Sequence, residues 1–140
     1  DGFSLATGVA LGNGGVYLGQ APDLLFLEDT DGDDKADKIT KLLTGFGMED
    51  RHELLNGFAW GPDGWLYMTH GVFTYSKVKD PNNPDDDGVR VDAALARYHP
   101  RTKKFEVFAD GTSNPWGVDW NERGDAFVSA CVIGNAKEKR

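Results

Sequence analysis

A hairpin pattern that occurs three times constrains the fold of this chain more than any other feature of its sequence. The central copy, residues 56–71, alternates aromatic and small residues, passes through a Gly-Pro-Asp-Gly turn and continues as a second apolar strand. Weaker copies of the same frame are residues 8–18 and 117–128. In each copy a turn glycine follows a leading glycine by seven residues, at positions 8 and 15, 57 and 64, and 117 and 124. We therefore expect one turn length and one strand register in all three hairpins.

The spacing of the copies predicts a repeat architecture. The leading glycines are 49 and then 60 residues apart, within or near the periods of propeller blades and solenoid units. Each repeat also has room for two more strands, which we expect at residues 24–28, 39–43, 94–98 and 105–108. Four strands per repeat favour a propeller.

The expected fold is therefore all-β, with about two and a half blades of a β-propeller. The predicted units are a blade at 8–46, a blade at 57–110 and the start of a further blade at 117–133. Because the chain begins inside one repeat and stops just after the third hairpin, we expect it to be a segment of a longer protein.

Charge and composition limit the partners that such a chain can bind. The 140 residues carry a formal net charge of −8, which argues against nucleic acid, since phosphate binding needs a basic face. Small ligands or divalent cations fit better. No apolar run approaches the ~18 residues of a membrane span. Cys131 is the only cysteine, and its apolar neighbours favour a small core residue over a reactive thiol.

Up-and-down strand order predicts that the candidate binding residues share one end of the sheets. The loops at that end, residues 45–56, 70–92 and 110–116, carry His52, Asn56, His70, Asn114 and Trp116. A histidine beside carboxylates can act as a general base. The alternative for His52 is an ordinary loop histidine paired with Asp50 or Glu53, and the same alternative holds for His70. His99, in a turn at the other end, is expected at the surface.

An acidic turn at that other end has the spacing of a calcium loop. Calcium takes six to eight oxygen ligands, and a tight loop supplies them from alternate residues. The carboxylates that would do so belong to Asp29, Asp31, Asp33 and Asp37. Asp34 stands where an EF-hand has glycine and Thr40 where it has glutamate, so the loop is closer to the shorter calcium turns that cap β-hairpins. The ion would be structural, and the alternative is a solvated acidic turn.

Residues 50–73 (DRHELLNGFAWGPDGWLYMTHGVF) and 111–132 (GTSNPWGVDWNERGDAFVSACV) together resemble a known family. They resemble bacterial membrane-bound dehydrogenase β-propeller domains, which are similar to the soluble glucose and sorbosone dehydrogenases that use pyrroloquinoline quinone. The resemblance covers about residues 8–134. It implies a six-bladed propeller, export to the periplasm or cell envelope, and a frequent fusion to cytochrome c or helical repeat domains.

The resemblance also implies an activity and its residues. In the sugar dehydrogenases a histidine just before the GPDG hairpin acts as the base, and His52 is its counterpart, one residue out of register. Residues 113–117 resemble the segment in which an arginine holds the quinone, with Ser113 at the arginine position. The implied function is oxidation of a sugar or alcohol hydroxyl, with hydride passing to a quinone. The residues around the quinone would be Asn56, His70, Asn114 and Trp116.

Two other functions remain open from the sequence. One is a non-catalytic propeller that binds carbohydrate on a platform made by Trp116 and the insertion at residues 70–92. The other is a structural propeller stabilised by calcium.

Overall fold

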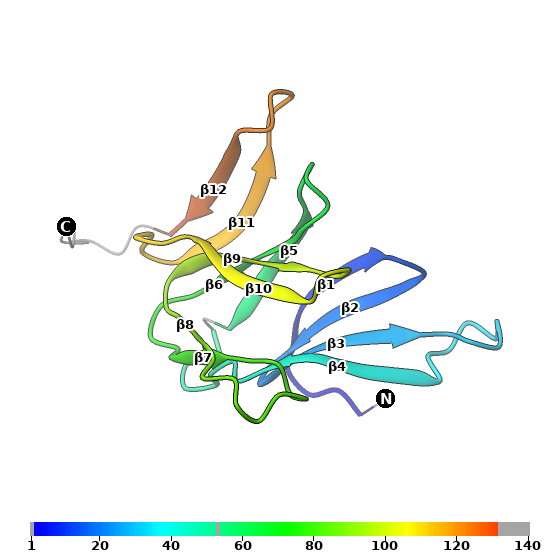
Figure 1. Ribbon diagram of the computed structural model, residues 1–140. Coiled ribbons are helices and arrows are strands. Elements are labelled where there is room, and N and C mark those ends of the chain that lie inside the picture. Colours follow the sequence, from blue (N-terminus) through cyan, green and yellow to red (C-terminus); the bar gives the residue numbers. More distant parts are fainter. Residues whose placement is uncertain (1, 53, 132–140) are drawn as a thin grey trace.

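The computed structural model describes residues 2–52 and 54–131, and its regular secondary structure consists of β-strands (Figure 1). Within those two ranges there is no helix, and so none that could cross a membrane. The strands are β1 (Ala6–Gly12), β2 (Gly15–Gln20), β3 (Asp23–Glu28), β4 (Lys38–Thr44), β5 (Leu55–Trp60), β6 (Leu66–His70), β7 (Ser76–Val78), β8 (Val89–Val91), β9 (Ala94–His99), β10 (Lys104–Ala109), β11 (Pro115–Trp120) and β12 (Ala126–Ala130).

Two four-stranded antiparallel sheets make up most of the fold. The first has the order β1-β2-β3-β4 and the second the order β5-β6-β9-β10, so that neighbours in space follow one another in the chain apart from the β7–β8 insertion. Two-stranded sheets formed by β7–β8 and by β11–β12 complete the described part, and none of the four sheets closes on itself. The expected all-β class is confirmed, and each expected strand is present.

The turn of the first hairpin differs from the expected one. Asn13 and Gly14 both have positive φ, 52° and 81°, and Gly12 pairs directly with Gly15. This is a two-residue turn, for which Asn-Gly is the preferred sequence because both central positions need the left-handed conformation. The expectation that Gly15 would be the turn glycine is wrong, because the Asn-Gly pair closes the turn one residue earlier.

The second and third hairpins share a longer turn. The Gly64 amide donates to the Gly61 carbonyl at 3.0 Å, and Gly61 donates to Trp65 at 2.9 Å. The third hairpin repeats both bonds, with Gly124 donating to Asn121 at 3.0 Å and Asn121 donating to Asp125 at 3.1 Å. Here the expected match in turn length and register is confirmed.

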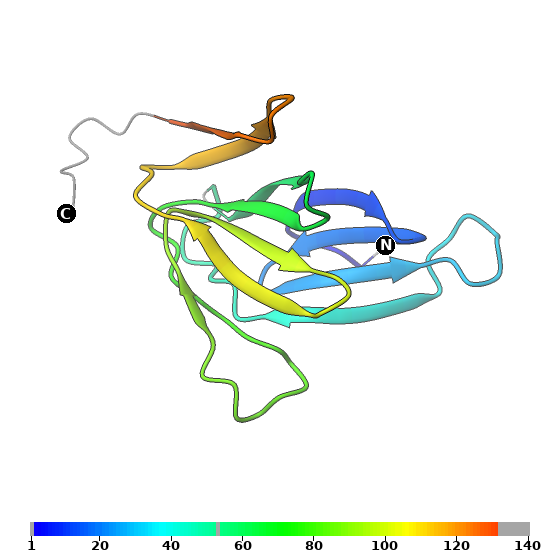
Figure 2. The same ribbon diagram turned by 45° about the horizontal axis from the view of Figure 1, so that its top comes forward.

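The long insertion after β6 contains a hairpin that the sequence pattern did not predict. β7 and β8 are three-residue strands that pair antiparallel, and their loop hangs away from the two main sheets (Figure 2). Val78 and Val91 are almost completely buried and belong to the main hydrophobic core. Burial of these two side chains stabilises strands that would be too short to form alone.

Where the first and second sheets pack together, aromatic side chains of β5 lie against glycines of β1. The Phe58 ring lies over Gly8, where a Cβ atom would come within 2.7 Å of it. Trp60 lies over Gly12 in the same way, and its Nε1–H donates to the Leu11 carbonyl at 2.7 Å. Leading strands of successive sheets therefore lie close together, with the core formed between the sheets.

The third hairpin continues this stacking. β11 contacts β5 and β6, and the Trp120 ring meets the Tyr67 ring edge to face at 4.9 Å between centroids. The register of all three hairpins shifts near the leading glycine, between Ala6 and Gly8, Asn56 and Ala59, and Pro115 and Gly117. Bulges of this kind bend a strand locally, so the repeat in the sequence is also a repeat in three dimensions.

Cys131 follows β12 and is exposed. Its expected place in the core is therefore wrong. β12 has β11 as its only strand neighbour in the described part of the chain, and most of its residues face solvent.

Candidate functional site

The strand order places turns at one end of the two main sheets and connecting loops at the other. We call these the turn end and the loop end. The turn end carries residues 13–14, 29–37, 61–65 and 100–103. The loop end carries residues 45–52, 54, 71–75 and 110–114. His52, Asn56, His70, Asn114 and Trp116 all belong to the loop end, as the strand order predicted.

His52 lies on a surface loop that is attached to the insertion. Its side chain is 94% exposed, and its Nδ1 lies 3.5 Å from the Asp50 carboxylate. The loop is tied to the insertion by three bonds: Thr74 Oγ1 to the Asp50 carbonyl, the Tyr75 amide to Glu49, and the Gly47 amide to Ser76 Oγ. The imidazole is thus available to a ligand in solution, on a loop whose base is anchored.

His70 is buried and both its ring nitrogens are used inside the protein. Nδ1 lies 2.9 Å from the Gly71 carbonyl, and Nε2 lies 2.5 Å from Ser76 Oγ. A carbonyl only accepts, so Nδ1 carries the proton and the Ser76 hydroxyl donates to Nε2. Burial holds the pKa of His70 below its ordinary value, which keeps the ring neutral. The geometry leaves no free ring nitrogen for a ligand.

Asn56 is also buried and hydrogen-bonded within the chain. Its Oδ1 accepts from Thr69 Oγ1 at 2.5 Å, and its Nδ2 donates to the Leu54 carbonyl at 2.7 Å. The bond from Thr69 ties β5 to β6 at the loop end. Both polar atoms of the Asn56 side chain are therefore bonded within the chain and are not available to a ligand.

Asn114 and Trp116 flank the start of β11. The Asn114 carbonyl accepts from the Cys131 amide at 3.0 Å, while its buried side-chain Oδ1 has no hydrogen-bond partner in the described part of the chain. Trp116 keeps 46% of its surface exposed. The Ser113 hydroxyl donates to the Cys131 carbonyl. The structure thus brings the loop-end residues together but presents only His52 and Trp116 to solvent.

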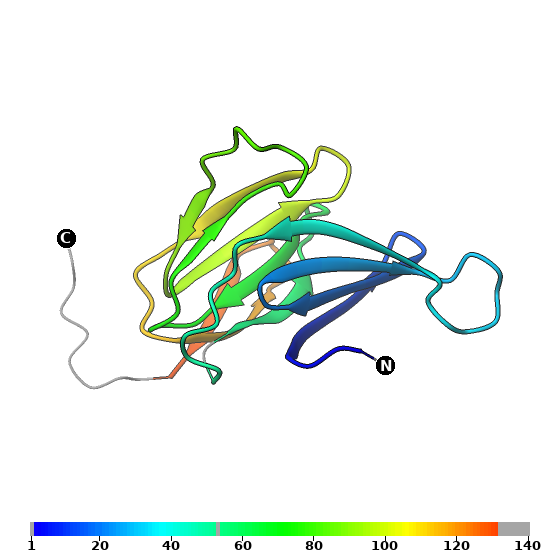
Figure 3. The same ribbon diagram turned by 90° about the horizontal axis from the view of Figure 1, so that it is seen from below.

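The acidic turn projects from the first sheet at the turn end (Figure 3). Carboxylate oxygens of Asp29, Asp31 and Asp33 lie within 4.8 Å of one another, a spacing that fits a hard cation. Both oxygens of Asp37 accept from Thr30, from the amide at 2.9 Å and from Oγ1 at 2.6 Å. Calcium binding therefore stays a prediction, in which three carboxylates converge and Asp37 closes the turn.

Hydrogen bonds also hold two of these carboxylates in their charged form. The Gly32 amide, at 2.7 Å, lowers the pKa of Asp29, with a further contribution from the Asp34 amide. The Thr30 hydroxyl and amide lower the pKa of Asp37. These two carboxylates thus favour their charged form more strongly than an ordinary aspartate does.

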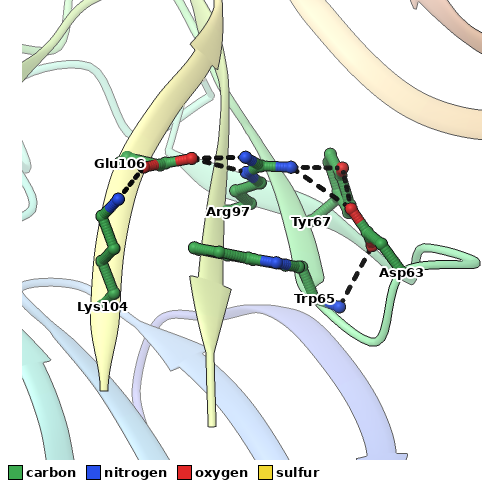
Figure 4. Close-up of polar contacts among 6 residues, drawn as sticks. All are labelled: Asp63, Trp65, Tyr67, Arg97, Lys104 and Glu106. Carbon is green, nitrogen blue, oxygen red and sulfur yellow. Dashed lines mark hydrogen bonds and ion pairs between the residues drawn. The ribbon is translucent and has the colours of Figure 1, made fainter. Parts of the chain in front are cut away.

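A second polar network was not anticipated from the sequence (Figure 4). The Arg97 guanidinium donates to Glu106 at 2.9 and 2.5 Å and to Asp63 at 3.2 Å, and it lies 4.2 Å above the Trp65 ring. Tyr67 donates to Asp63 at 2.8 Å. Glu106 lies opposite Arg97 on the adjacent strand. Their opposite charges are placed symmetrically about the turn at 100–103, and this sequence pattern could have predicted the pair.

Comparison with known proteins gives one match. The family model for a domain of unknown function, DUF7133, matches residues 1–137. No curated protein and no solved structure matches the chain. Because the family model covers nearly the whole sequence, the chain belongs to the DUF7133 family.

Proposed function

We propose that this chain forms consecutive blades of a β-propeller and that its loop end binds carbohydrate. Support for the propeller comes from two antiparallel four-stranded sheets followed by a third hairpin, with the leading strands β1, β5 and β11 in contact in that order. This is the arrangement in which blades surround a central axis. A six-bladed ring is the form that the family resemblance implies.

The observation that carries the binding proposal is the exposed indole of Trp116 at the start of β11. Large aromatic side chains usually lie in the core, and an exposed one at a loop end offers a flat apolar face with a polar edge. Phe73 and Tyr75, in the insertion at the same end, are also exposed. Sugar rings present C–H groups that pack on such faces and hydroxyls that bond to the polar groups nearby.

The residues expected around a quinone give little support to a site for that cofactor. The polar side-chain atoms of Asn56 and His70 form hydrogen bonds within the chain. Ser113 supplies no charge at the position where the resembling enzymes have arginine. These features do not support a quinone site among the described residues, and we derive no step through that cofactor.

Oxidation of a hydroxyl is the second candidate function. It is favoured by one feature, the exposed imidazole of His52 with the Asp50 carboxylate beside it. In this arrangement the carboxylate would orient the ring and stabilise the imidazolium that forms when it takes a proton.

Affinity electrophoresis through gels that contain cellulose derivatives, xylan or starch tests the proposal. We expect Trp116→Ala to weaken binding about tenfold, since an aromatic contact contributes roughly 0.5–1.5 kcal/mol beyond the area it buries. Phe127→Ala is the matched control, because Phe127 is an exposed aromatic residue on β12. His52→Gln should leave retardation unchanged.

The two candidates give opposite results. Retention that survives Trp116→Ala but is lost in His52→Gln would contradict the binding proposal. Dye reduction with a sugar and added pyrroloquinoline quinone, lowered by roughly 10²- to 10⁴-fold in His52→Gln, would support the oxidoreductase, since that is the usual effect of losing a general base.

A further inference from the structure

A groove opens at the turn end, between the first and second sheets. It lies where the turn between β9 and β10 approaches the β1–β2 turn, and its volume is about 650 Å³. Its walls include Leu11, Trp60, His99, Pro100 and Arg101. A volume of this size is within the range of small-molecule sites. None of the residues expected at the loop end lines it.

A smaller hollow of about 270 Å³ adjoins the groove. The two share Asn13, Pro100 and Arg101, and the smaller one is also lined by Tyr17 and Phe26. Arg101 thus borders both spaces. Together they offer a mainly apolar and aromatic surface to which Arg101 contributes on both sides.

The acidic residue of the groove already has partners within the second sheet. Asp63 Oδ1 accepts from the Trp65 amide, and its Oδ2 accepts from the Tyr67 hydroxyl and from Arg97 (Figure 4). In Figure 4 the Asp63 carboxylate points toward Tyr67 and Arg97. Arg97, which also pairs with Glu106, therefore offsets part of the Asp63 charge.

The arginine of the groove has no such partner. Arg101 makes no ion pair or hydrogen bond with any residue that the structure describes. Lys104 pairs with Glu106 at 2.8 Å, and Lys103 lies outside the groove lining. The unpaired guanidinium of Arg101 is therefore the cation that the groove offers, and it attracts anions and repels cations.

His99 adds a directional donor. The Thr102 amide donates to His99 Nδ1 at 3.2 Å, so the proton of the neutral ring lies on Nε2. The ring stands edge to face on Trp65, with 5.0 Å between centroids. Among the described residues Nε2 has no partner, so this N–H is available to a ligand beside the guanidinium.

We propose that the groove binds a small organic anion that has one carboxylate and an apolar or aromatic body. The carboxylate pairs with Arg101, whose planar fork matches its two oxygens. The body packs against Leu11, Trp60 and Pro100. A single guanidinium beside a neutral imidazole suits one negative charge, whereas a phosphate group would call for more cations. The site goes beyond the carbohydrate proposal, because it lies at the opposite end of the strands from Trp116.

Isothermal titration of the intact chain with 2-naphthoate tests the site. We expect saturable binding of one molecule per chain. Arg101→Gln should weaken it by about tenfold or more, since hydrogen bonds to charged groups are worth roughly 1.5–3 kcal/mol. Arg101→Lys keeps the charge without the fork and should give an intermediate affinity. Lys103→Gln, in the same turn but outside the groove lining, is the matched control and should bind as the parent does.

Two further ligands separate the parts of the proposal. Neutral 2-naphthalenemethanol should bind about tenfold more weakly than the acid, because it cannot pair with the guanidinium. Inorganic phosphate should compete poorly. Absence of saturable binding, or equal affinity in Arg101→Gln, would overturn the site. Phosphate that competes as well as 2-naphthoate would overturn the role of the apolar wall. Arg101 is exposed, so its variants should melt as the parent does, and circular dichroism checks this.

Discussion

The histidines of this chain show how strongly the surroundings of a side chain decide its role. His52 is exposed beside Asp50, His70 is buried between a carbonyl and a hydroxyl, and His99 accepts a bond from its own turn. His52 lies on its expected loop, whereas His70 and His99, expected in a loop and in a turn, are the last residues of β6 and β9. The sequence cannot predict these differences, because they depend on segments that are distant in the chain: Ser76 reaches His70 only after the insertion has folded back.

The buried His70 should make stability depend on pH. The pKa of His70 is lowered in the folded protein. At pH values below the ordinary histidine pKa of about 6.5, the unfolded chain therefore binds a proton at this residue more readily than the folded chain does. Stability should therefore fall as the pH drops from about 7.5 towards 5.5, with a slope that approaches 1.4 kcal/mol per pH unit.

Urea unfolding at several pH values measures this slope. His70→Gln should lose about 1–3 kcal/mol at pH 7.5, because Ser76 and Gly71 lose their partner, and should show a flatter pH profile. His52→Gln is the control and should keep the slope of the parent. A His70→Gln profile as steep as that of the parent would contradict this assignment.

Calcium, if it binds the acidic turn, should stabilise the folded protein through Asp29, Asp31 and Asp33. An ion that binds only the folded state adds about 2.7 kcal/mol at a hundredfold excess over its dissociation constant. Melting in calcium and in chelator measures the gain, and Asp31→Asn should remove most of it. Asp85→Asn, in a separate acidic run, should not. A melting temperature that does not change when chelator is added would contradict calcium binding.

At the scale of elements, the strands could be read from the sequence more reliably than the turns. Apolar alternation and continuous apolar runs located the strands of both main sheets, because edge strands bury one face while β6 is buried along its whole length. The β7–β8 hairpin was not predicted, because it lies in a polar insertion and its short strands depend on the burial of Val78 and Val91. The first turn was predicted one residue too late, because the prediction followed the spacing of the glycines and not the Asn13-Gly14 pair, which is typical of a two-residue turn.

The packing of Phe58 on Gly8 gives a test of how the first two sheets fit together. Gly8→Ala should cost about 1–3 kcal/mol, since the added Cβ would lie 2.7 Å from the ring. Gly117→Ala is the matched control in the third hairpin, where the nearest atom is Ser129 Oγ at 3.3 Å.

Denaturant titrations give both free energies of unfolding. In Phe58→Leu the smaller side chain should leave room for the Cβ atom, so Gly8→Ala should cost less in that background. Equal costs at Gly8 and Gly117 would contradict the close approach.

At the scale of the whole molecule, the described sheets leave apolar strand residues uncovered. Val9 and Leu11 on β1, Phe108 on β10 and Phe127 on β12 are all exposed, and no sheet in the described ranges is closed. Exposed edges and apolar faces favour association.

We therefore expect the 140-residue chain to associate as its concentration rises. Sedimentation velocity from micromolar to submillimolar concentration measures this. Leu11→Lys should reduce association, and Lys35→Arg, at an exposed position of the acidic turn, should not. A monomer at all concentrations, with one sharp reversible melting transition, would contradict the prediction.

The Arg97 network also joins parts of the molecule that would otherwise open separately. The guanidinium links the tip of the β5–β6 hairpin, through Asp63, to the edge strand β10, through Glu106, while lying on the Trp65 ring (Figure 4). An edge strand normally frays first and exchanges its amide protons fastest. Arg97 lies on β9 and is shared by Asp63 and Glu106, so opening of β10 removes one of its two carboxylate partners. We expect this shared contact to couple the opening of β10 to that of the hairpin tip. In Arg97→Met, hydrogen exchange followed by mass spectrometry should show the two segments opening separately.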